Sequence, residues 1–573
     1  MRSLYKHSLI IFLLFANAFC YAQQPQTYCN PLNLDYTYMI YNANDGISYR
    51  SGADPAVVRF KGEYYLFVTR SMGYWHSTDL TNWNFITPEK WYFQGSNAPA
   101  AHNYKDSVLY VMGDPSGTMS VLYTDNPKKG DWKATPALLF DLQDPALFID
   151  DDEKAYVYWG SSNVFPIRAK TVDKNKNFKP SIQTDTLFGL NALQHGWERF
   201  GEDNEGEISG YIEGAWMTKY KDSYYLQYAA PGTEFNVYGD GAYTSKSPLG
   251  PFTYMANNPF SFKPGGFING AGHGSTVDDI EGKYWHFSTM AVSVNVNWER
   301  RISLFPTYFD ADGLLYSDSY FGDYPYYAPN AKEKAGEFTG WMLLSYNKKV
   351  ETSSAVAAYT GNLLTDENIK TFWLAENTDA SQWVEIDLEK VSSIYALQIN
   401  FHDYQSNLYG RIPNLMHQYV IKGSLNGKDW FMLVDKSANT KDVPNDYVQL
   451  EQAKEARYIR YEHLKVPTPH LAISDIRIFG RGNGKVPKAV KKFTVKRQAD
   501  ERNADITWEH DPKANGYNIL WGIAPDKLYS SWLIYGKDKL DLRSLTKGQS
   551  YYFAIESFNE NGISTRSEIL KID

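Results

Sequence analysis

Cysteine is nearly absent from this sequence, which limits how the chain can be held together. The 573 residues include 2 cysteines, Cys20 and Cys29. Cys20 falls in an N-terminal stretch that has the pattern of a removable leader, so Cys29 would remain as the only thiol. An internal disulfide is therefore excluded, and the folded protein must be stabilised by packing.

Stripes of basic residues and long amphipathic helical patterns are also lacking. The formal net charge is −9, and no run of Lys and Arg supplies the phosphate-neutralising surface that a nucleic-acid binder needs. We therefore exclude nucleic acid as a partner. The scarcity of apolar residues at helical spacing argues against a helical architecture.

The long apolar run that the sequence does contain lies at the N-terminus. Arg2 and Lys6 precede the run SLIIFLLFANAFC, and Cys20-Tyr21-Ala22 forms a small-x-small cleavage sequence before Gln23. This pattern predicts a signal peptide over residues 1–22, whose apolar core is too short for a comfortable membrane span. We expect an exported protein, periplasmic or secreted. Lipid attachment at Cys20 is the alternative, but Phe19 is bulky where a lipid-attachment site has a small residue.

Aromatic residues are abundant and favour a β-rich fold. They make up 16% of the chain, with 45 Tyr and 16 Trp, and such residues are enriched in strands. Aromatic rings also pack on the C–H faces of sugars, although an aromatic β core explains most of them. The length exceeds what one hydrophobic core usually holds and predicts roughly three or four domains.

A strand-pair pattern recurs along the first half of the chain. Gly52-Ala53-Asp54-Pro55 precedes AVVRFKGEYYLFVTRS, which reads as two alternating strands around the turn Lys61-Gly62. Similar units follow over residues 96–113, 142–160, 212–232 and 270–290. Their spacing of about 45 to 70 residues is near that of a four-stranded propeller blade with its loops. The sequence therefore predicts a five-bladed β-propeller.

Equivalent residues of successive blades converge in a propeller, because the first strand of each blade lines the central channel. The units align on Asp54, Pro99, Asp144, Glu213 and His273. Glu213 lies between apolar neighbours at a strand start, surroundings that favour the protonated carboxyl of a general acid. Taken singly, Glu213 would be a solvated carboxylate and each Asp-Pro a turn starter. Their shared place in the repeat favours one catalytic pocket instead.

Residues 28 to about 325 resemble glycoside hydrolase family 43, the five-bladed propeller glycosidases. The matching pieces are Ala53-Asp54-Pro55, HSTDLTNW, Asn97-Ala98-Pro99, Gln143-Asp144-Pro145 with FIDDDEKAYVYWG, Glu213-Gly214, Gly272-His273-Gly274, and Arg300 before ISLFPTYFDADG. Ala215 departs from the family, in which many members have proline at this place.

The resemblance implies a role for each carboxylate. Asp54 would be the base that activates water, Glu213 the acid that protonates the leaving oxygen, and Asp144 the residue that orients the acid and keeps it protonated. Inverting hydrolysis places the base and the acid about 6.5–9.5 Å apart, on opposite faces of the sugar.

Three further residues follow from the resemblance, each with a simpler alternative. His273 is similar to the histidine under the family's pocket, which binds a structural calcium ion directly or through water; a core histidine without metal is the alternative. Arg300 resembles a substrate-contacting arginine, or it pairs with a neighbouring carboxylate. Trp75 would pack on the sugar ring, or it belongs to the core.

The rest of the chain resembles two β-sandwiches. Residues 326–344 are rich in turn formers and are predicted to link them to a propeller domain of residues 23–325. Residues 345–482 are similar to the discoidin-like domain of carbohydrate-binding module family 32, and residues 483–573 to a fibronectin type III domain, in which Tyr551 would form the tyrosine corner. The predicted fold class is therefore all-β.

These features predict an exported, inverting exo-glycosidase that acts on a polysaccharide or oligosaccharide. Its substrate would be a terminal pentose or furanose residue, as in an α-L-arabinofuranosidase or a β-xylosidase. A galactofuranosidase or galactan-active enzyme of the same fold is the first alternative, and a non-catalytic glycan-binding propeller the second. A third interpretation makes the discoidin-like domain the functional part and the propeller its scaffold. We expect instead that the propeller without residues 345–573 still cleaves small substrates.

Overall fold

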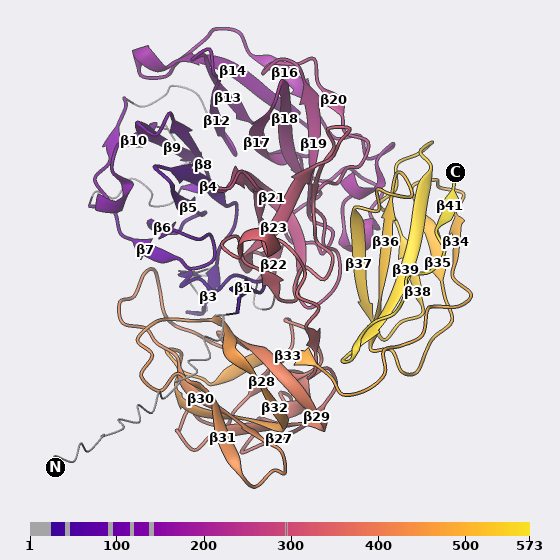
Figure 1. The fold of residues 1–573 in the computed structure, drawn as a ribbon. Coiled ribbons are helices and arrows are strands. Elements are labelled where there is room, and N and C mark those ends of the chain that lie inside the picture. The colour runs from indigo at the N-terminus through magenta and orange to yellow at the C-terminus, as the bar shows by residue number, and fades with distance from the viewer. Residues whose placement is uncertain are drawn as a thin grey trace, which may run out of the picture.

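The structure is a computed structural model that describes residues 24–40, 46–89, 96–114, 120–136, 142–292, 294 and 296–573. The predicted signal peptide lies outside these residues. Figure 1 shows three bodies built of strands: a ring of sheets, one sandwich below it and one beside it. Helical structure in the described residues is confined to the short 3-10 turns η1 (Pro127–Lys129), η2 (Lys174–Lys176), η3 (Gly196–Glu198), η4 (Glu202–Asn204), η5 (Lys332–Lys334) and η6 (Gly361–Leu364). The predicted all-β class is confirmed, and no described helix is long and apolar enough to cross a membrane.

Five antiparallel sheets form the propeller in the described part of the chain. Blade 1 contains β4 (Ala56–Phe60), β5 (Glu63–Phe67), β6 (Tyr74–Ser77) and β7 (Asn84–Ile86). Blade 2 contains β8 (Asn97–Tyr104), β9 (Val108–Asp114), β10 (Leu122–Thr124) and β11 (Lys133–Ala134). Blade 3 contains β12 (Ala146–Ile149), β13 (Ala155–Trp159), β14 (Ile167–Asp173), β15 (Lys179–Pro180) and β16 (Asp185–Phe188).

Blades 4 and 5 complete the ring. Blade 4 contains β17 (Glu213–Tyr220), β18 (Ser223–Ala230), β19 (Gly239–Ser245) and β20 (Thr253–Tyr254). Blade 5 contains β21 (Asn269–Asp278), β22 (Tyr284–Ala291), β23 (Arg300–Phe309) and β24 (Leu315–Ser317). The first strand of each blade contacts that of the next, and β21 contacts β4, so the ring is closed around the five first strands.

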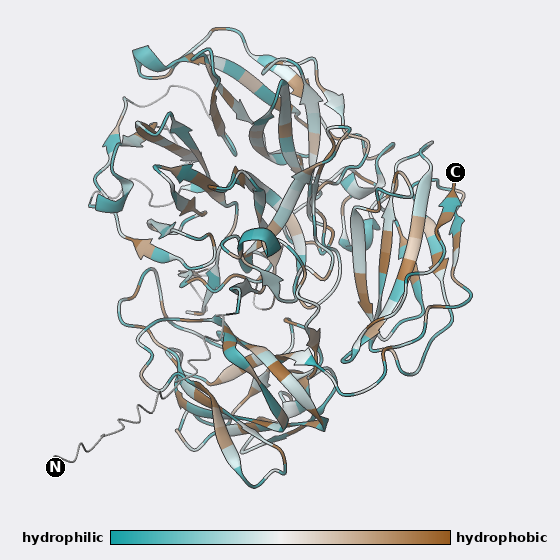
Figure 2. Ribbon diagram, viewed as in Figure 1, coloured by the Kyte–Doolittle hydropathy of each residue, from teal (hydrophilic) through white to brown (hydrophobic). Residues whose placement is uncertain are grey.

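Both faces of each blade are apolar because each blade is packed between two others. One buried cluster joins blades 1 and 2 through Phe67, Tyr74 and Trp132, and corresponding clusters fill the other gaps. Figure 2 shows hydrophobic residues concentrated along the strands and hydrophilic residues in the connections. This packing explains the aromatic composition better than sugar binding does.

The lower sandwich has the sheet order β26-β33-β29-β32-β30-β31, with β27 on β29 and β28 on β33. Its strands are β26 (Met342–Leu343), β27 (Lys349–Thr352), β28 (Trp373–Leu374), β29 (Trp383–Phe401), β30 (Gln418–Ser424), β31 (Trp430–Asp435), β32 (Asn445–Lys465) and β33 (Ala472–Arg481). The segment predicted as a linker is ordered. Within it, β25 (Tyr326–Tyr327) pairs with β1 (Thr27–Tyr28), and β26 pairs with β33.

The C-terminal sandwich, residues 494–572, packs a three-stranded sheet against a five-stranded one. The first contains β34 (Thr494–Arg497), β35 (Ala504–Thr507) and β38 (Lys539–Leu542), and the second β36 (Gly516–Gly522), β37 (Ser530–Tyr535), β39 (Tyr551–Asn559), β40 (Gly562–Ile563) and β41 (Leu570–Ile572). The Tyr551 hydroxyl accepts a hydrogen bond from the Thr546 amide at 3.1 Å, as a tyrosine corner does. The fibronectin type III assignment stays a prediction.

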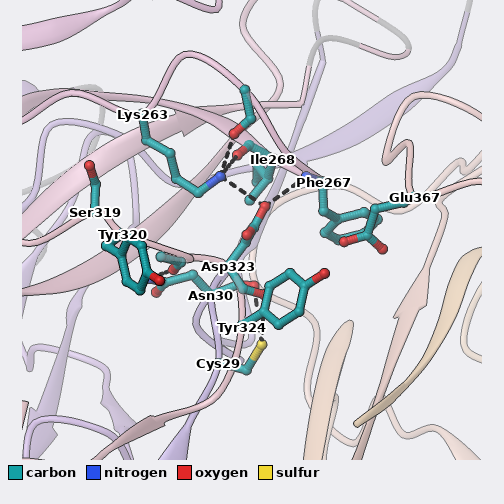
Figure 3. Close-up of polar contacts among 12 residues, drawn as sticks. Cys29, Asn30, Lys263, Phe267, Ile268, Ser319, Tyr320, Asp323, Tyr324 and Glu367 are labelled. Carbon is teal, nitrogen blue, oxygen red and sulfur yellow. Dashed lines mark hydrogen bonds and ion pairs between the residues drawn. The ribbon is translucent and has the colours of Figure 1, made fainter. Parts of the chain in front are cut away.

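A buried ionic network joins the propeller to the lower sandwich (Figure 3). The Asp323 carboxylate accepts hydrogen bonds from Lys263 Nζ at 2.8 Å and from the Phe267 amide at 2.7 Å. Arg477 of β33 donates to the Asp323 carbonyl at 2.7 Å and pairs with Glu367 at 2.6 Å. The Cys29 thiol donates to the same carbonyl, and burial raises its pKa to about 12. The lone thiol is therefore a packed structural group.

A second set of contacts attaches the lower sandwich to the propeller beside blade 1. The hairpin of β2 (Thr37–Ile40) and β3 (Ser48–Ser51) carries Arg50, which is fully buried. Arg50 pairs with Asp403 at 3.1 Å and with Asp442 at 2.6 Å. The lower sandwich is thus fixed to the propeller by buried ion pairs.

Replacing Arg477 by methionine should lower the free energy of unfolding by about 3–5 kcal/mol, because Glu367 would be left as an unpaired buried charge. Thermal and denaturant unfolding of the whole chain measure this loss. The matched control is Arg457→Met, which removes a bidentate pair with Asp387 whose arginine side chain is 38% exposed; it should cost less than about 1 kcal/mol. Equal losses in the two variants would contradict the assignment of a stabilising role to this network.

A second prediction concerns Glu198, which is fully buried in the connection between blades 3 and 4. Burial raises its pKa to about 7, although Tyr228 and the Asn191 amide donate to the carboxylate. Because the folded pKa is raised, protonated Glu198 stabilises the folded protein. This stabilisation is complete below the unfolded pKa of 4.5 and is lost as the pH rises through the folded pKa of about 7. Glu198→Gln cannot ionise, so its melting temperature relative to wild type should increase between pH 4.5 and 7.

The control for this pH dependence is Glu153→Gln. Lys105 and Lys174 hold the pKa of Glu153 near 2, so its titration lies outside the measured range. Its melting temperature should follow that of the wild type across the range. A constant difference between Glu198→Gln and wild type would contradict the prediction.

Candidate active site

Each blade has a residue in the left-handed backbone region near the start of its first strand. It lies two residues before the strand in blades 1 and 3, is the second residue of the strand in blades 2 and 4, and is the fifth in blade 5. The φ angles are 55° at Asp54, 38° at Ala98, 48° at Asp144, 65° at Gly214 and 46° at His273. This region is unfavourable for side chains other than glycine, and such strain concentrates at functional sites. The ring therefore places a sharp turn of the chain near the start of the first strand in each blade.

His273 brings the predicted carboxylates together. Its Nδ1 lies 3.3 Å from Asp54 Oδ1 and 3.8 Å from Asp144 Oδ2, and its side chain is 12% exposed. Burial alone would lower the pKa of His273, but the charges of Asp54, Asp144, Glu213 and Asp240 raise it. The imidazole thus lies among acidic groups from three other blades, which favour its protonated form.

Asp54 is held as a carboxylate. Its Oδ2 accepts a hydrogen bond from Thr69 Oγ1 at 2.5 Å, and Arg300 Nη1 lies 3.6 Å from its Oδ1. Burial raises the pKa of Asp54, but His273, Arg300 and the Thr69 hydroxyl together outweigh burial and lower it. An ionised carboxylate with restricted exposure is the group that a general base requires.

Glu213 is fixed through both carboxyl oxygens. Tyr238 donates to Oε1 at 2.6 Å, and Ser161 donates to Oε2 at 3.2 Å. The glycine that follows is required by space, since a Cβ on Gly214 would lie 2.8 Å from His273 Cγ. The Glu-Gly pair therefore allows the acid to lie beside the histidine.

Asp240 of β19 anchors His273 from behind. Its carboxylate accepts from the amides of His273 at 2.8 Å and Gly274 at 2.9 Å, and its Oδ2 lies 2.9 Å from His286 Nε2. Because these bonds fix the backbone of the left-handed residue, Asp240 orients the imidazole without contacting a substrate. A Cβ on Gly272 would lie 2.7 Å from Tyr238, so the glycines beside His273 make room for the residues that position the site.

Sequence reasoning did not identify Thr69, Ser161, Tyr238 or Asp240. None of these residues starts a blade, so the repeat phase gives no signal for them. The flanking glycines Gly272 and Gly274 were the available signal, because paired glycines around a functional residue indicate close approach by neighbours.

Arg300 is a buried residue beside Asp54. Its Nη1 donates to Thr233 at 3.3 Å, and its guanidinium carbon lies 5.4 Å from the ring centroid of Trp298. Trp298 is 45% exposed. Burial raises the pKa of the nearby Glu234 carboxyl. Arginine, a carboxyl group and an open indole provide the hydrogen bonds and the flat apolar face that sugars contact.

Trp75 does not belong to this cluster, which corrects the prediction that it packs on a sugar ring. It is 1% exposed, packs against Phe85 in the core between blades 1 and 5, and donates to Asp35 at 2.6 Å. Its strand β6 is the third of blade 1, whereas the first strand of each blade lines the channel. Trp298 is the exposed tryptophan next to Arg300.

The donor set does not fit a calcium ion held by protein ligands. His273 Nδ1 already faces two carboxylates, and the described residues include no group of three His, Cys, Asp or Glu side chains that could hold a metal. We therefore derive no step through calcium.

A cavity of about 720 Å³ lies elsewhere, between blade 1 and the lower sandwich. Its lining includes Asp35, Trp83, Arg411, Asp442 and Tyr447. The three predicted catalytic carboxylates do not line it. The chemistry of the cluster, and not cavity size, identifies the candidate active site.

Comparisons with known proteins identify similar domains. Residues 46–315 match the family model described as "Glycosyl hydrolases family 43", and residues 349–474 match "F5/8 type C domain". The chain is 26% identical over 207 residues to Xylosidase/arabinosidase 43A of Humicola insolens, covering 30% of this chain and 58% of that protein. It is 27% identical over 267 residues to Xylan 1,3-beta-xylosidase of a Vibrio species, covering 41% and 47%.

A solved glycoside hydrolase structure is also similar, with 20% identity, coverage of 75% of this chain and 97% of that chain, and a TM-score of 0.45. The chain spans about half the length of the two curated relatives from Humicola insolens and Vibrio. Residues 46–315 are therefore a glycosyl hydrolase family 43 domain, and the lower sandwich contains an F5/8 type C domain.

Proposed function

We propose that the chain is an inverting glycosidase that releases terminal pentose or furanose residues, of the α-L-arabinofuranosidase or β-xylosidase type, from a polysaccharide or oligosaccharide. The observation that carries this proposal is the meeting of Asp54, Asp144 and Glu213 around His273, with Asp54 held ionised. The relatives named for xylosidase and arabinosidase activity support a pentose substrate.

In this mechanism Asp54 removes a proton from a water molecule as its oxygen attacks the anomeric carbon. Glu213 gives its proton to the glycosidic oxygen on the other face, and the bond between that oxygen and the anomeric carbon breaks. One proton is taken up and one is donated, so exchange with solvent restores both groups. Tyr238 and Ser161 orient Glu213, while His273 and Arg300 keep Asp54 charged.

We also propose roles for the other parts of the chain. We propose that the leader of residues 1–22 exports the protein and that the discoidin-like domain contacts the glycan to which the scissile residue is attached. The fibronectin type III identity of residues 483–573 is also a proposal, supported by the two-sheet topology and the Tyr551 hydrogen bond.

Asp54→Asn and Glu213→Gln should each lower turnover of an unactivated aryl glycoside by about 10²–10⁴-fold, since each removes one proton-transfer group. The panel should include phenyl α-L-arabinofuranoside, β-D-xyloside and β-D-galactofuranoside. NMR of the first product formed should show inverted configuration. Wild-type turnover that both variants retain would rule out this mechanism, and activity on the galactofuranoside alone would assign the alternative specificity.

Thr69→Val should shift the acidic limb of the kcat/KM profile to higher pH. The Thr69 hydroxyl lowers the pKa of Asp54, so its loss raises that pKa, and the base is then protonated at pH values where it was ionised before. The matched control is Thr289→Val, because Thr289 accepts a bond from the Asp54 amide and does not contact the carboxylate at hydrogen-bond distance. Identical profiles for wild type and Thr69→Val would contradict this account.

A further inference from the structure

The long connection between blades 3 and 4 is bound by the C-terminal sandwich. Residues 194–196 run beside residues 545–547. The Gly196 amide donates to the Leu545 carbonyl at 2.8 Å, and the Lys547 amide donates to the Gln194 carbonyl at 2.9 Å. Figure 1 shows this sandwich beside blade 4. The two segments thus pair as adjacent strands do.

Side chains reinforce the pairing. Arg199 Nη2 donates to Asn503 Oδ1 and to the Arg543 carbonyl, both at 2.6 Å, and Arg502 Nη1 donates to the Ala192 carbonyl at 2.7 Å. A Cβ on Gly196 would lie 2.4 Å from the Arg543 carbonyl oxygen. The contact is therefore close enough that only glycine fits at this position.

The same segment holds the chain immediately before the catalytic acid. The Gly210 amide donates to the Glu198 carbonyl at 3.1 Å, and the Phe200 amide donates to the Ile208 carbonyl at 3.1 Å. Ile212 then exchanges backbone hydrogen bonds with Ser162 at 2.9 and 3.0 Å. Gly210 is therefore hydrogen-bonded to the docked segment and lies three residues before Glu213, the proposed acid.

Glu198 adds a second connection to the acid strand. Its Oε1 accepts from the Tyr228 hydroxyl at 2.6 Å. Tyr228 lies in β18 next to Ala229, which is the register partner of Glu213 in β17. The docked segment therefore supports both the residues before Glu213 and the strand that pairs with it.

We propose that the C-terminal sandwich, through Gly196 and Arg199, positions Glu213 for proton donation and is not a spacer. This inference rests on the proposed function of Glu213. It also opposes the expectation that the propeller acts alone, because the support of the acid lies in residues beyond 500. Gly196 and Arg199 are positioning residues, since neither contacts Glu213.

The chemistry provides a selective readout. Departure of dinitrophenolate needs little protonation, whereas departure of an alkyl or unsubstituted phenyl alcohol depends on the general acid. A displaced acid should slow the second class of substrate, and the first should be nearly unaffected. General loss of structure would slow both alike.

The test compares full-length Gly196→Ala with wild type on matched dinitrophenyl and phenyl glycosides. We expect kcat/KM for the phenyl glycoside to fall about 10- to 100-fold, as for a misplacement near 1 Å, with little change for the dinitrophenyl glycoside. Lys527→Ala is the control: Lys527 also joins this sandwich to the propeller, through Asp310 at 2.8 Å, but on the turn between β23 and β24. The control should leave both rates within about twofold, because the turn that Lys527 contacts lies in blade 5 and not in the connection that precedes Glu213.

The outcomes distinguish the positioning role of the C-terminal sandwich from the glycosidase activity on which it rests. Equal rates, or equal losses for the two leaving groups in Gly196→Ala, would overturn the positioning role while the glycosidase proposal stands. A wild type that cleaves neither glycoside, nor any other of the panel, would overturn both. If Gly196→Ala does not fold, Arg199→Met gives the same comparison, because it removes side-chain contacts without crowding the backbone.

Discussion

The attraction between the His273 imidazole and its acidic neighbours is the interaction on which the site depends. Ionised carboxylates from separate blades repel one another, and a positive charge between them offsets that repulsion. The acidic neighbours raise the pKa of His273 and so favour its cationic form, and Asp240 fixes its backbone. The left-handed turns at the starts of the blades then aim the side chains at one point. The propeller matters to the chemistry because it brings those turns together.

The attached domains are continuous with the propeller through buried charges. Arg50 of the propeller is paired with two aspartates of the lower sandwich, and Lys263 and Asp323 lie under Arg477. Groups of this kind are costly to bury singly and tolerable only when each finds its partner. The propeller and the lower sandwich therefore supply partners for each other's buried charged groups. Neither sandwich can be regarded as an independent appendage, although the sequence read alone gave each the appearance of one.

The repeat phase predicts the fold and the main carboxylates well, for a physical reason. A propeller repeats the same strand pattern, so residues at one phase must lie at one place, and Asp54, Asp144 and His273 followed from this rule. Thr69, Tyr238 and Asp240 did not, because each reaches the site from near the end of a strand that is not the first of its blade, where the repeat gives no signal. Trp75 was misplaced because hairpin position does not say which face of a blade a ring occupies. The docking of residues 191–199 on the C-terminal sandwich depends on contacts across more than 300 positions, which local patterns do not encode.

The strand at Thr27–Tyr28 has a consequence for how the molecule is completed. It pairs with Tyr326–Tyr327, the Thr27 amide donates to Gln449, and Asn30 donates to the carbonyls of Leu304 and Gly322. On a growing polypeptide these first residues leave the ribosome long before any of their partners has been made. Residues 27–30 therefore cannot form these hydrogen bonds until the propeller and most of the lower sandwich have been synthesised. Their late pairing then joins the two domains.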